Sequence, residues 1–538
     1  MKKIFLIIAI VGVAGLSSCT KKQLADDYTD PSKVSSTTVE KQFAGFLSAN
    51  LGYAMYQYWN YFVVLQNTML PWTQTVGIIN SPGRYVPGAA AIDTRWSNYY
   101  ASMAQYKELL RLYSTLSTAD QADKRIYIIA ATIYFYDQTQ KTVDLYGSIP
   151  WSNAGLLGTN GGDYVKSTPT YDDPSTIYTT MLDDLKGFSD ELNTISLKTG
   201  VATVINTQDF INHGDLTKWK KYCNSLRMRM LTRVSGVASF QSRVSSEIAA
   251  MLANPSNYPL VLTNADNILI SVTDPTTGVS NGSGTGSGAS FHTGLIGWGG
   301  GDISGKVMVD FMNNNADPRL RTIFAPGDSA KPAGTYTGLD PSLGNTPATD
   351  LVNSGKLARY NRSTLSQNIY VPGMIINAAE VNFLLSEYYL NAGNDASAKS
   401  TYEAGINQSV DYYYYLRTIS NDNTDMLSLK PPAPAEKSAY IASSGVAWAT
   451  AATTAEKLNR IATQKWINYN VLEPDENWAE IRRLKLPALV FVADNSGLAS
   501  LPPNRWVLPS NEITYNSTNY EAVAANDKLS TKIFWDIK

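Results

Sequence analysis

The stretch Val381–Tyr389 (VNFLLSEYY), together with Ala398–Gly405 (AKSTYEAG) that follows it, decides the fold class of this chain. In the first segment, apolar side chains recur at i, i+3, i+4 and i+7 from Val381, which is the spacing of one stripe along an α-helix. The second segment begins and ends with a small residue and has an aromatic residue, Tyr402, between them. Small residues allow two helices to approach closely, and a ring fills the space left between them. The two segments therefore predict a pair of closely packed antiparallel helices.

The order of residue sizes in this helix pair matches a known helical repeat. The first helix has large, small and aromatic residues and the second has small, aromatic and small ones, as in a tetratricopeptide repeat: Leu385, Ser386, Tyr389, Ala398, Tyr402 and Gly405. Ala131 and Tyr134 begin a weaker second copy. The pattern predicts a mainly α-helical protein whose scaffold is built from tetratricopeptide-like helix pairs.

Helical periodicity extends over much of the remaining chain. It predicts further helices over Val39–Tyr58, Trp96–Tyr113, Lys124–Val143, Pro174–Leu192, Leu216–Val234, Ala378–Asn391, Ser397–Tyr415, Ala455–Tyr469 and Glu476–Arg483. By contrast, Pro71–Gly88 predicts a loop, and Thr273–Gly305 is rich in Gly and Ser and has no helical period. Because no proline- or serine-rich hinge divides the chain, we expect one α-helical domain over residues 35–538, with a loop-rich insertion over about residues 255–375.

The N-terminus has the pattern of an exported lipoprotein. A positively charged start precedes the apolar run Ile4–Leu16, which has signal-peptide length and is too short to span a bilayer. The run closes with Leu-Ser-Ser-Cys, which resembles a bacterial lipobox, in which the thiol of the cysteine, here Cys19, is acylated. An ordinary signal peptide followed by an incidental cysteine is the alternative. We expect a signal peptide over residues 1–18, then a lipid anchor and flexible tether over residues 19–34.

Charge and cysteine content exclude several classes of protein. The formal net charge is −2, so the chain lacks the basic footprint of a nucleic-acid-binding protein. After Cys19 only Cys223 remains, so the mature chain has no intrachain disulfide. No later segment approaches the 18 consecutive apolar residues of a membrane span. We therefore expect the lipid to be the only membrane attachment.

Two motifs associated with enzymes lack the context that they need. Gly300–Lys306 has the spacing of a phosphate-binding P-loop, but Val307 stands where a Ser or Thr would hold Mg²⁺. Gly278–Gly282 matches Gly-x-Ser-x-Gly, but it lies in a glycine-rich stretch without the strand and helix that flank a nucleophile elbow. We expect neither nucleotide hydrolysis nor serine catalysis.

Histidines and paired acids also argue against catalysis. The chain has two histidines, His213 and His292, which are too few for a metal site built mainly of histidine. A glycosidase needs two positioned carboxylates, and Asp172–Asp173 and Asp183–Asp184 are available. Adjacent acids beside a helix start are more typical of caps and solvated faces. We expect no enzyme activity, no metal and no cofactor.

Aromatic side chains are the best candidates for ligand binding. They make up 11% of the residues, and flat rings on a rigid scaffold can stack on sugars or grip extended peptides. Those in loops cannot belong to a helix core, which selects Trp72, Tyr85, Trp298 and Tyr336. For each of these rings, contact with a partner protein and local packing remain alternatives. Hydrogen bonds to the ligand are expected from nearby polar residues, namely Asn80, Arg84 and Asn98.

Several segments resemble signatures of the SusD/RagB family of Bacteroidetes lipoproteins, in particular of its SusD-like branch. They follow the family's order along nearly the whole chain: Asp144–Trp151 (DLYGSIPW), Trp219–Arg229 (WKKYCNSLRMR), Asp317–Leu320 (DPRL), Gln464–Ile467 (QKWI), Trp478–Arg483 (WAEIRR) and Pro503–Asn519. Trp478 and Arg482 lie at i and i+4 on one helix face, where a guanidinium can stack on the ring and bond carbonyls. We interpret Arg482 and Arg483 as a structural clamp on the C-terminal segment.

The resemblance implies a function as well as a fold. It implies an outer-membrane protein that faces the cell exterior, binds an oligosaccharide or a peptide, and delivers it to a SusC-like TonB-dependent transporter. The family's ligand residues vary in position, so none is carried over to this chain. A surface glycoside hydrolase or peptidase, and a structural lipoprotein of a barrel complex, remain as alternatives.

Overall fold

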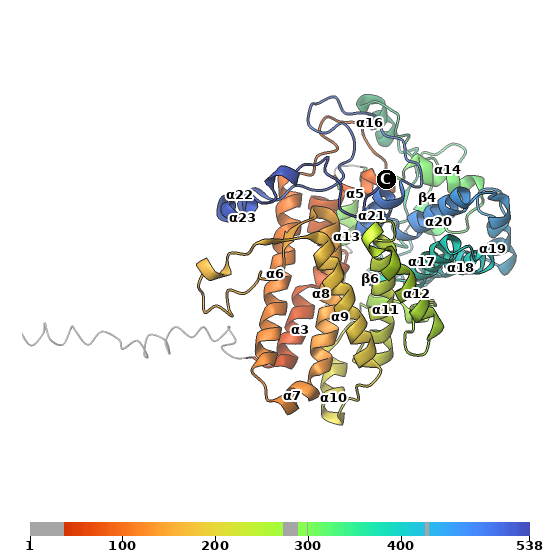
Figure 1. Ribbon diagram of the computed structural model, residues 1–538. Helices are drawn as coiled ribbons and strands as arrows, with labels where there is room; N and C mark the ends of the chain where they lie inside the picture. Colours follow the sequence, from red (N-terminus) through yellow and green to blue (C-terminus); the bar gives the residue numbers. More distant parts are fainter. Residues whose placement is uncertain (1–36, 273–288, 298–299, 425–429) are drawn as a thin grey trace, which may run out of the picture.

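Helices make up most of the structure, and many loops gather at one end of it (Figure 1). The computed structural model describes residues 37–272, 289–297, 300–424 and 430–538. Within these residues the strands are only two to four residues long. The predicted mainly α-helical fold class is therefore confirmed. The predicted signal peptide, lipid anchor and tether, residues 1–34, lie outside the described residues.

The first half of the chain supplies a row of long helices that lie side by side in Figure 1: α3 (Val39–Ala49), α6 (Ala89–Ser114), α8 (Arg125–Tyr146), α9 (Pro174–Leu192), α11 (Leu216–Arg233) and α12 (Gln241–Ala253). Helix α9 has the predicted bounds because its start is well specified. The Asp173 carboxylate accepts hydrogen bonds from the backbone N–H groups of Ser175 and Thr176, and proline occupies the first turn. No helix among the described residues is both long and apolar enough to cross a bilayer.

Helices α17 (Ala378–Asn391) and α18 (Asp395–Thr418) form the pair that the tetratricopeptide-like spacing predicts. Ser386 Oγ donates a hydrogen bond to the carbonyl oxygen of Ala398 at 2.7 Å, which requires close approach of the two backbones. A Cβ atom on Gly405 would lie 2.5 Å from the ring of Phe383, so only glycine fits there. Tyr402 is fully buried and donates to the carbonyl oxygen of Val446 at 2.9 Å. The predicted helix pair is confirmed.

Of the two arginines interpreted as a clamp, Arg482 contacts the C-terminal segment, whereas Arg483 pairs with Glu387 and Glu480. Arg482, in helix α21 (Pro474–Leu484), donates from Nη1 to the carbonyl oxygens of Asp144 and Asn504, both at 2.8 Å. Its guanidinium lies 5.4 Å from the ring centroid of Trp478 and 5.1 Å from that of Trp535. One arginine thus joins α8, α21 and the last residues of the chain.

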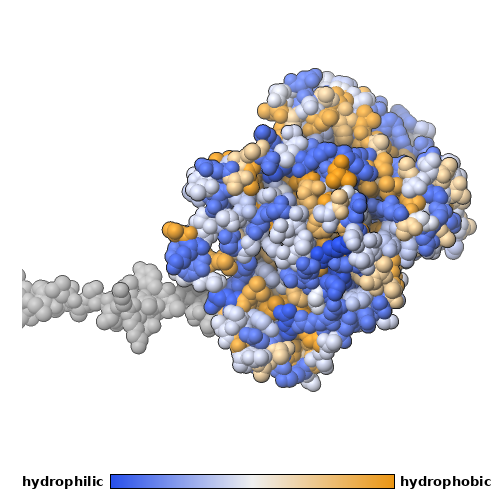
Figure 2. All heavy atoms as spheres, viewed as in Figure 1, coloured by the Kyte–Doolittle hydropathy of each residue, from blue (hydrophilic) through white to orange (hydrophobic). Residues whose placement is uncertain are grey.

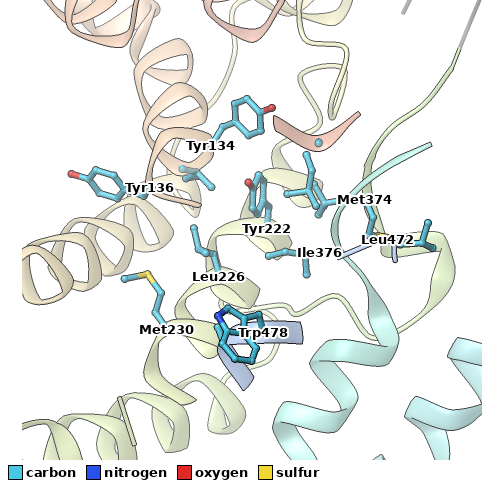
Figure 3. Close-up of a cluster of buried hydrophobic side chains, with 14 of the residues drawn as sticks. Tyr134, Tyr136, Tyr222, Leu226, Met230, Met374, Ile376, Leu472 and Trp478 are labelled. Carbon is cyan, nitrogen blue, oxygen red and sulfur yellow. The ribbon is translucent and has the colours of Figure 1, made fainter. Parts of the chain in front are cut away.

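Apolar side chains from distant segments meet in one core (Figure 3). Strand β6 (Gly373–Ile376) pairs antiparallel with β3 (Ile268–Ile270) and faces helices α8 and α11 there. Helix α20 (Thr454–Tyr469) leads into α21, whose Trp478 completes the cluster. The labelled residues are all buried: Tyr134, Tyr136, Tyr222, Leu226, Met230, Met374, Ile376, Leu472 and Trp478.

Two arginines of α11 are buried among carboxylates from other helices. Arg229 Nε donates to Glu380 Oε1 at 2.5 Å, and its Nη1 donates to Asp137 Oδ1 at 3.2 Å. Arg233 is paired with Glu476 and lies 3.2 Å from Asp144 Oδ2. These ion pairs connect α11 to α8, α17 and α21, and each side chain is at most 4% exposed.

A second buried group of charges continues from the first. Lys465 Nζ donates to Glu387 at 2.9 Å and to Glu480 at 2.7 Å. Arg483 pairs with the same two carboxylates, both at 2.7 Å. Although burial alone would raise it, the positive charges of Arg483 and Lys465 hold the pKa of Glu480 well below its usual range. Because Lys465 belongs to α20, the ionic network extends to this helix. The charges of both groups are paired with charges of opposite sign.

Two parts of the fold differ from the prediction. The helix expected over Val39–Tyr58 ends at Ala49 and is followed by α4 (Leu51–Ala54) and the π-helix η1 (Trp59–Leu65), because Asn50 turns back and donates to the carbonyl oxygen of Phe46. The expected loop Thr273–Gly305 contains α13 (Ala289–Ile296), whose buried Phe291 and Leu295 pack against the core. Residues 273–288 and 298–299 of that loop lie outside the described residues.

Sequence analysis also missed several short elements. Their apolar stripes are too short to show a clear helical period. They include the helices α5 (Met69–Trp72), α7 (Thr118–Asp123), α10 (Thr199–Gln208), α14 (Lys306–Asn314), α15 (Leu320–Ile323), α16 (Asn345–Asn353), α19 (Pro434–Ile441), α22 (Ser510–Tyr515) and α23 (Ser517–Tyr520), and the strand pairs β1 (Ile149–Pro150) with β2 (Tyr171–Asp172) and β4 (Phe324–Ala325) with β5 (Arg359–Tyr360).

The contact between Gly405 and Phe383 predicts a large difference between two glycine substitutions. We expect Gly405→Ala to lower the free energy of unfolding by about 1–3 kcal/mol, because the new methyl group overlaps a buried ring. Gly187→Ala is the matched control, since Gly187 lies inside α9 with no atom within 4 Å of the added Cβ. That change should raise stability by about 0.5–1 kcal/mol. Urea unfolding of both variants measures the difference, and equal effects would contradict the proposed packing.

Glu473 predicts a dependence of stability on pH. Burial, followed by the negative charge of Glu380, raises the pKa of Glu473 well above its usual range. As pH rises above about 4.5, the unfolded chain loses this proton while the folded chain keeps it, so stability falls. Glu473→Gln removes this loss. The free energy of unfolding of the variant should therefore rise relative to that of the natural protein by up to about 1.4 kcal/mol per pH unit. Unfolding measured from pH 5 to pH 8 tests this, and a difference that stays constant with pH would refute it.

Candidate ligand-binding site

A cavity of about 350 Å³ lies between α4, the start of η1, α6 and α8. It exists because the chain turns after α3, which leaves the upper parts of α6 and α8 uncovered on this side. Gly52 shapes its wall: a Cβ atom there would lie 2.6 Å from Gln57 Oε1 and 3.3 Å from the ring of Trp59. The cavity is at the small end of the range of about 300–1,000 Å³ that is typical of ligand pockets.

Two oriented aromatic rings form one side of the cavity. Trp59 Nε1 donates to Gln57 Oε1 at 2.6 Å, which holds the half-buried indole in place. The hydroxyl of Tyr53 donates to Asp137 Oδ1 at 2.7 Å. Burial, followed by the charge of Asp137, raises the pKa of Tyr53 well above its ordinary value, so this hydroxyl stays a donor. The rings therefore offer fixed apolar faces to a ligand.

Polar side chains of α6 and α8 line the opposite side. Ser102 Oγ donates to Gln138 Oε1 at 2.7 Å, so the amide group of Gln138 points its Nε2 elsewhere. That Nε2 atom has no hydrogen-bond partner, although Gln138 is only 4% exposed. Asn98 is exposed and also lines the cavity. The cavity thus combines apolar faces with hydrogen-bonding groups, as a binding site for a polar ligand requires.

The charged residues of the lining are both basic. Arg95 pairs with Asp475, which does not line the cavity, and this pair holds the pKa of Arg95 above its usual value despite burial. Lys141 Nζ lies 4.6 Å from the ring centroid of Tyr53 and 3.9 Å from Asp137 Oδ1. Among the described residues, the lining includes no carboxylate, histidine or cysteine, so this part of the chain does not supply the cavity with the carboxylate pair that glycoside hydrolysis uses.

The acids considered for catalysis have structural contacts. Asp172 accepts hydrogen bonds from the backbone N–H groups of Trp151 and Ser152, both at 3.0 Å. Asp183 pairs with Arg243 at 2.8 Å, and Asp184 accepts from the hydroxyl of Tyr136. These contacts, with the cap formed by Asp173, agree with a structural role. Within the described residues, no group of three or more His, Cys, Asp or Glu residues is arranged to hold a metal ion.

Two of the aromatic residues predicted to bind ligand lie in the protein interior. Trp72 is 0% exposed, donates to the carbonyl oxygen of Arg84 at 3.0 Å and packs 5.6 Å from Trp478. Tyr85 is also 0% exposed and donates to the carbonyl oxygen of Val492 at 2.8 Å. Neither ring offers a face to a ligand here, so of the three alternatives local packing describes both.

The remaining candidates lie elsewhere. Tyr336 is half-buried and its carbonyl oxygen accepts from Asn313, but it does not line the cavity. Trp298 and the predicted lipidation site Cys19 lie outside the described residues. Of the polar residues expected to assist binding, Asn98 lines the cavity.

Sequence analysis missed the residues that form the cavity: Tyr53, Trp59, Gln138 and Lys141. The available signal was Gly52, a glycine inside a predicted helix, which weakens that helix and allows a break. The break itself depends on which helices lie next to it. A helical pattern read along one segment therefore could not show that a cavity opens there.

A helical-repeat scaffold with a cavity lined by aromatic and amide side chains is typical of a ligand-binding protein. The comparisons define the family more closely. The family model SusD-like_2, described as starch-binding associating with outer membrane, matches residues 35–509. The chain belongs to this SusD-like family, which is a family of binding proteins associated with the outer membrane.

Solved structures with the same fold support this assignment. A chitin-binding protein is 21% identical, with a TM-score of 0.72 over 92% of this chain and 100% of that chain. A SusD-like protein named as Bacteroidetes AC2a is 20% identical, with a TM-score of 0.72 over 93% and 100% of the two chains. A SusD homolog from Bacteroides fragilis is 20% identical, with a TM-score of 0.69 over 94% and 100%. No curated protein matches the chain.

Proposed function

We propose that this protein captures a carbohydrate in the cavity between α4, η1, α6 and α8 and does no chemistry on it. The observation that carries the proposal is the pairing of fixed aromatic faces, Tyr53 and Trp59, with the unpartnered amide donor of Gln138. Sugars present apolar ring faces and many hydrogen-bonding groups, and this lining complements both. The family's description as starch-binding and the chitin-binding structural relative favour a glycan over a peptide.

We further propose that the protein works at the cell surface with a SusC-like TonB-dependent transporter. The lipobox-like sequence at Cys19 supports an acyl anchor in the outer membrane, with the body facing outward. The protein would hold the glycan and release it to the transporter, and the energy for import would come from the partner.

An exposed apolar rim, formed by Leu157, Tyr164, Val165, Ile513 and Tyr515, is a candidate docking surface for that transporter. Val165 is 88% exposed and Tyr515 is 82% exposed, which is unusual for large apolar and aromatic side chains. The first three residues lie on the excursion between β1 and β2, whose tip is apolar in Figure 2. Asn516 and Asn519 both donate to the carbonyl oxygen of Pro169 at 3.0 Å, which holds α22 and α23 against this excursion.

Binding of oligosaccharides tests the proposed function. Calorimetry with starch-, chitin- and uronate-derived oligosaccharides should identify a ligand that binds without being cleaved. Trp59→Ala should weaken its binding about tenfold or more, because the variant loses an aromatic face of the cavity. Tyr415→Ala is the control, since Tyr415 is 48% exposed but does not line the cavity, and it should leave the affinity unchanged.

Other outcomes of this experiment favour the alternatives. Turnover of a bound oligosaccharide would support a surface hydrolase. Failure of every oligosaccharide to bind would support a structural lipoprotein. Equal loss of affinity in Trp59→Ala and Tyr415→Ala would show that the ligand lies outside the cavity.

The docking surface is tested in cells that produce the natural transporter. Purification of the tagged protein from solubilised outer membranes should yield a TonB-dependent barrel, identified by mass spectrometry. The double variant Val165→Asp, Tyr515→Asp should lose most of it, because two charges then lie in the apolar contact. Val204→Asp, on α10, introduces a charge at another exposed apolar site and should retain the barrel. Retention by the double variant would exclude this rim.

A further inference from the structure

We infer that the cavity between α4, η1, α6 and α8 recognises an acidic sugar, and that Lys141 and Gln138 bind its carboxylate. This inference rests on the proposed function, because it names the class of glycan that the same cavity binds. It follows from the hydrogen-bonding groups that the described structure leaves without a partner in the lining.

The ammonium group of Lys141 has N–H donors that are not used in hydrogen bonds. Asp137 is the nearest carboxylate among its ion pairs, but the distance of 3.9 Å is too long for a hydrogen bond. The oxygens of Asp137 are already engaged, because they accept hydrogen bonds from Tyr53 at 2.7 Å, Tyr222 at 2.8 Å and Arg229 at 3.2 Å. The Lys141 side chain is only 11% exposed, so water compensates its charge poorly.

The carboxylates behind α8 do not supply the missing partner. Glu380 is paired with Arg229, and Glu476 is paired with Arg233. Burial, followed by the charge of Glu380, raises the pKa of Glu473 well above its usual range. The charge of Lys141 acts against this rise, but among the described residues no ion pair or hydrogen bond joins Lys141 to Glu473. The positive charge of Lys141 is therefore available to a ligand.

Gln138 supplies a second donor close to the first. It precedes Lys141 by three residues in α8, so both side chains lie on the same face of the helix, and both line the cavity. Its Nε2 atom is buried and unpartnered, which is unfavourable unless a ligand or water accepts the hydrogen bond. A carboxylate has two acceptor oxygens and a negative charge, and it satisfies both groups at once.

The remaining lining favours an anion over a cation. Arg95 also lines the cavity, where Asp475 already compensates its charge, and among the described residues no carboxylate lines the cavity to repel an anionic ligand. Trp59 and Tyr53 then lie where the rest of the sugar ring can contact an aromatic face. The structure thus assigns the carboxylate to the α8 side of the cavity and the sugar ring to the η1 side.

The experiment uses matched probes that differ only in charge. Oligosaccharides of galacturonic acid and of glucuronic acid are compared by calorimetry with the same oligosaccharides after reduction of their carboxyl groups to alcohols. We expect the natural protein to bind one of the acidic probes at least tenfold more tightly than its reduced counterpart. The preference should shrink as salt is raised, because it rests on a charge pair.

Variants then locate the preference. Lys141→Met should bring the affinities for the acidic and reduced probes within about twofold of each other, while the reduced probe binds as before. Lys107→Met is the matched control, since Lys107 is on α6 but does not line the cavity, and it should keep the full preference. The salt dependence of the natural protein provides a test that needs no variant.

The outcomes separate the inference from the proposed function. Neutral oligosaccharides that bind as well as acidic ones, or a preference that survives Lys141→Met, would overturn the inference and leave glycan capture intact. If no carbohydrate binds, whether acidic or neutral, the proposed function fails and the inference fails with it.

Discussion

The arrangement of the helices depends on the buried ionic network. Arg229, Arg233, Lys465 and Arg483 neutralise carboxylates that come from α8, α17 and α21. A buried charge without a partner is strongly destabilising. Each helix must therefore take the axial position and rotation that bring its charged residue to its partner. Apolar packing tolerates small shifts between helices, whereas bidentate pairs such as Arg483 with Glu387 and Glu480 do not. The network therefore specifies the register between the first and last thirds of the chain.

Helix α8 connects the ionic network to the cavity. Asp137 and Asp144 on its inner side accept from Arg229, Tyr178 and Trp535, which prevents rotation of the helix about its axis. Gln138 and Lys141 are neighbours of these residues in sequence and point to the cavity instead. Their donors are thus positioned by charges that never meet the ligand. One side of α8 is therefore held in the ionic network, while Gln138 and Lys141 supply polar groups to the lining of the cavity.

Much of the helical scaffold could be predicted from the sequence, and the site could not. Helices α9 and α17 have the predicted bounds because Asp173 and Asn377 cap their first turns, which is a local effect. The small residues of α17 and α18 likewise report a local contact. Trp72 and Tyr85 lie in segments that look like exposed loops, but Trp478 packs against Trp72 and the distant segment around Val492 covers Tyr85. Contacts between residues far apart in sequence determine which loop covers each ring. They also determine where the break after α3 exposes α8.

The contacts of Asp144 have a consequence for the order of assembly. Its side chain accepts a hydrogen bond from Trp535 and its carbonyl oxygen accepts one from Arg482, so α8 obtains these partners from segments that are synthesised long after it. Until those residues emerge, the first half has a buried acid without its full set of partners and an uncovered apolar face. We therefore expect the first half to pack fully only after Arg482 and Trp535 are available to α8.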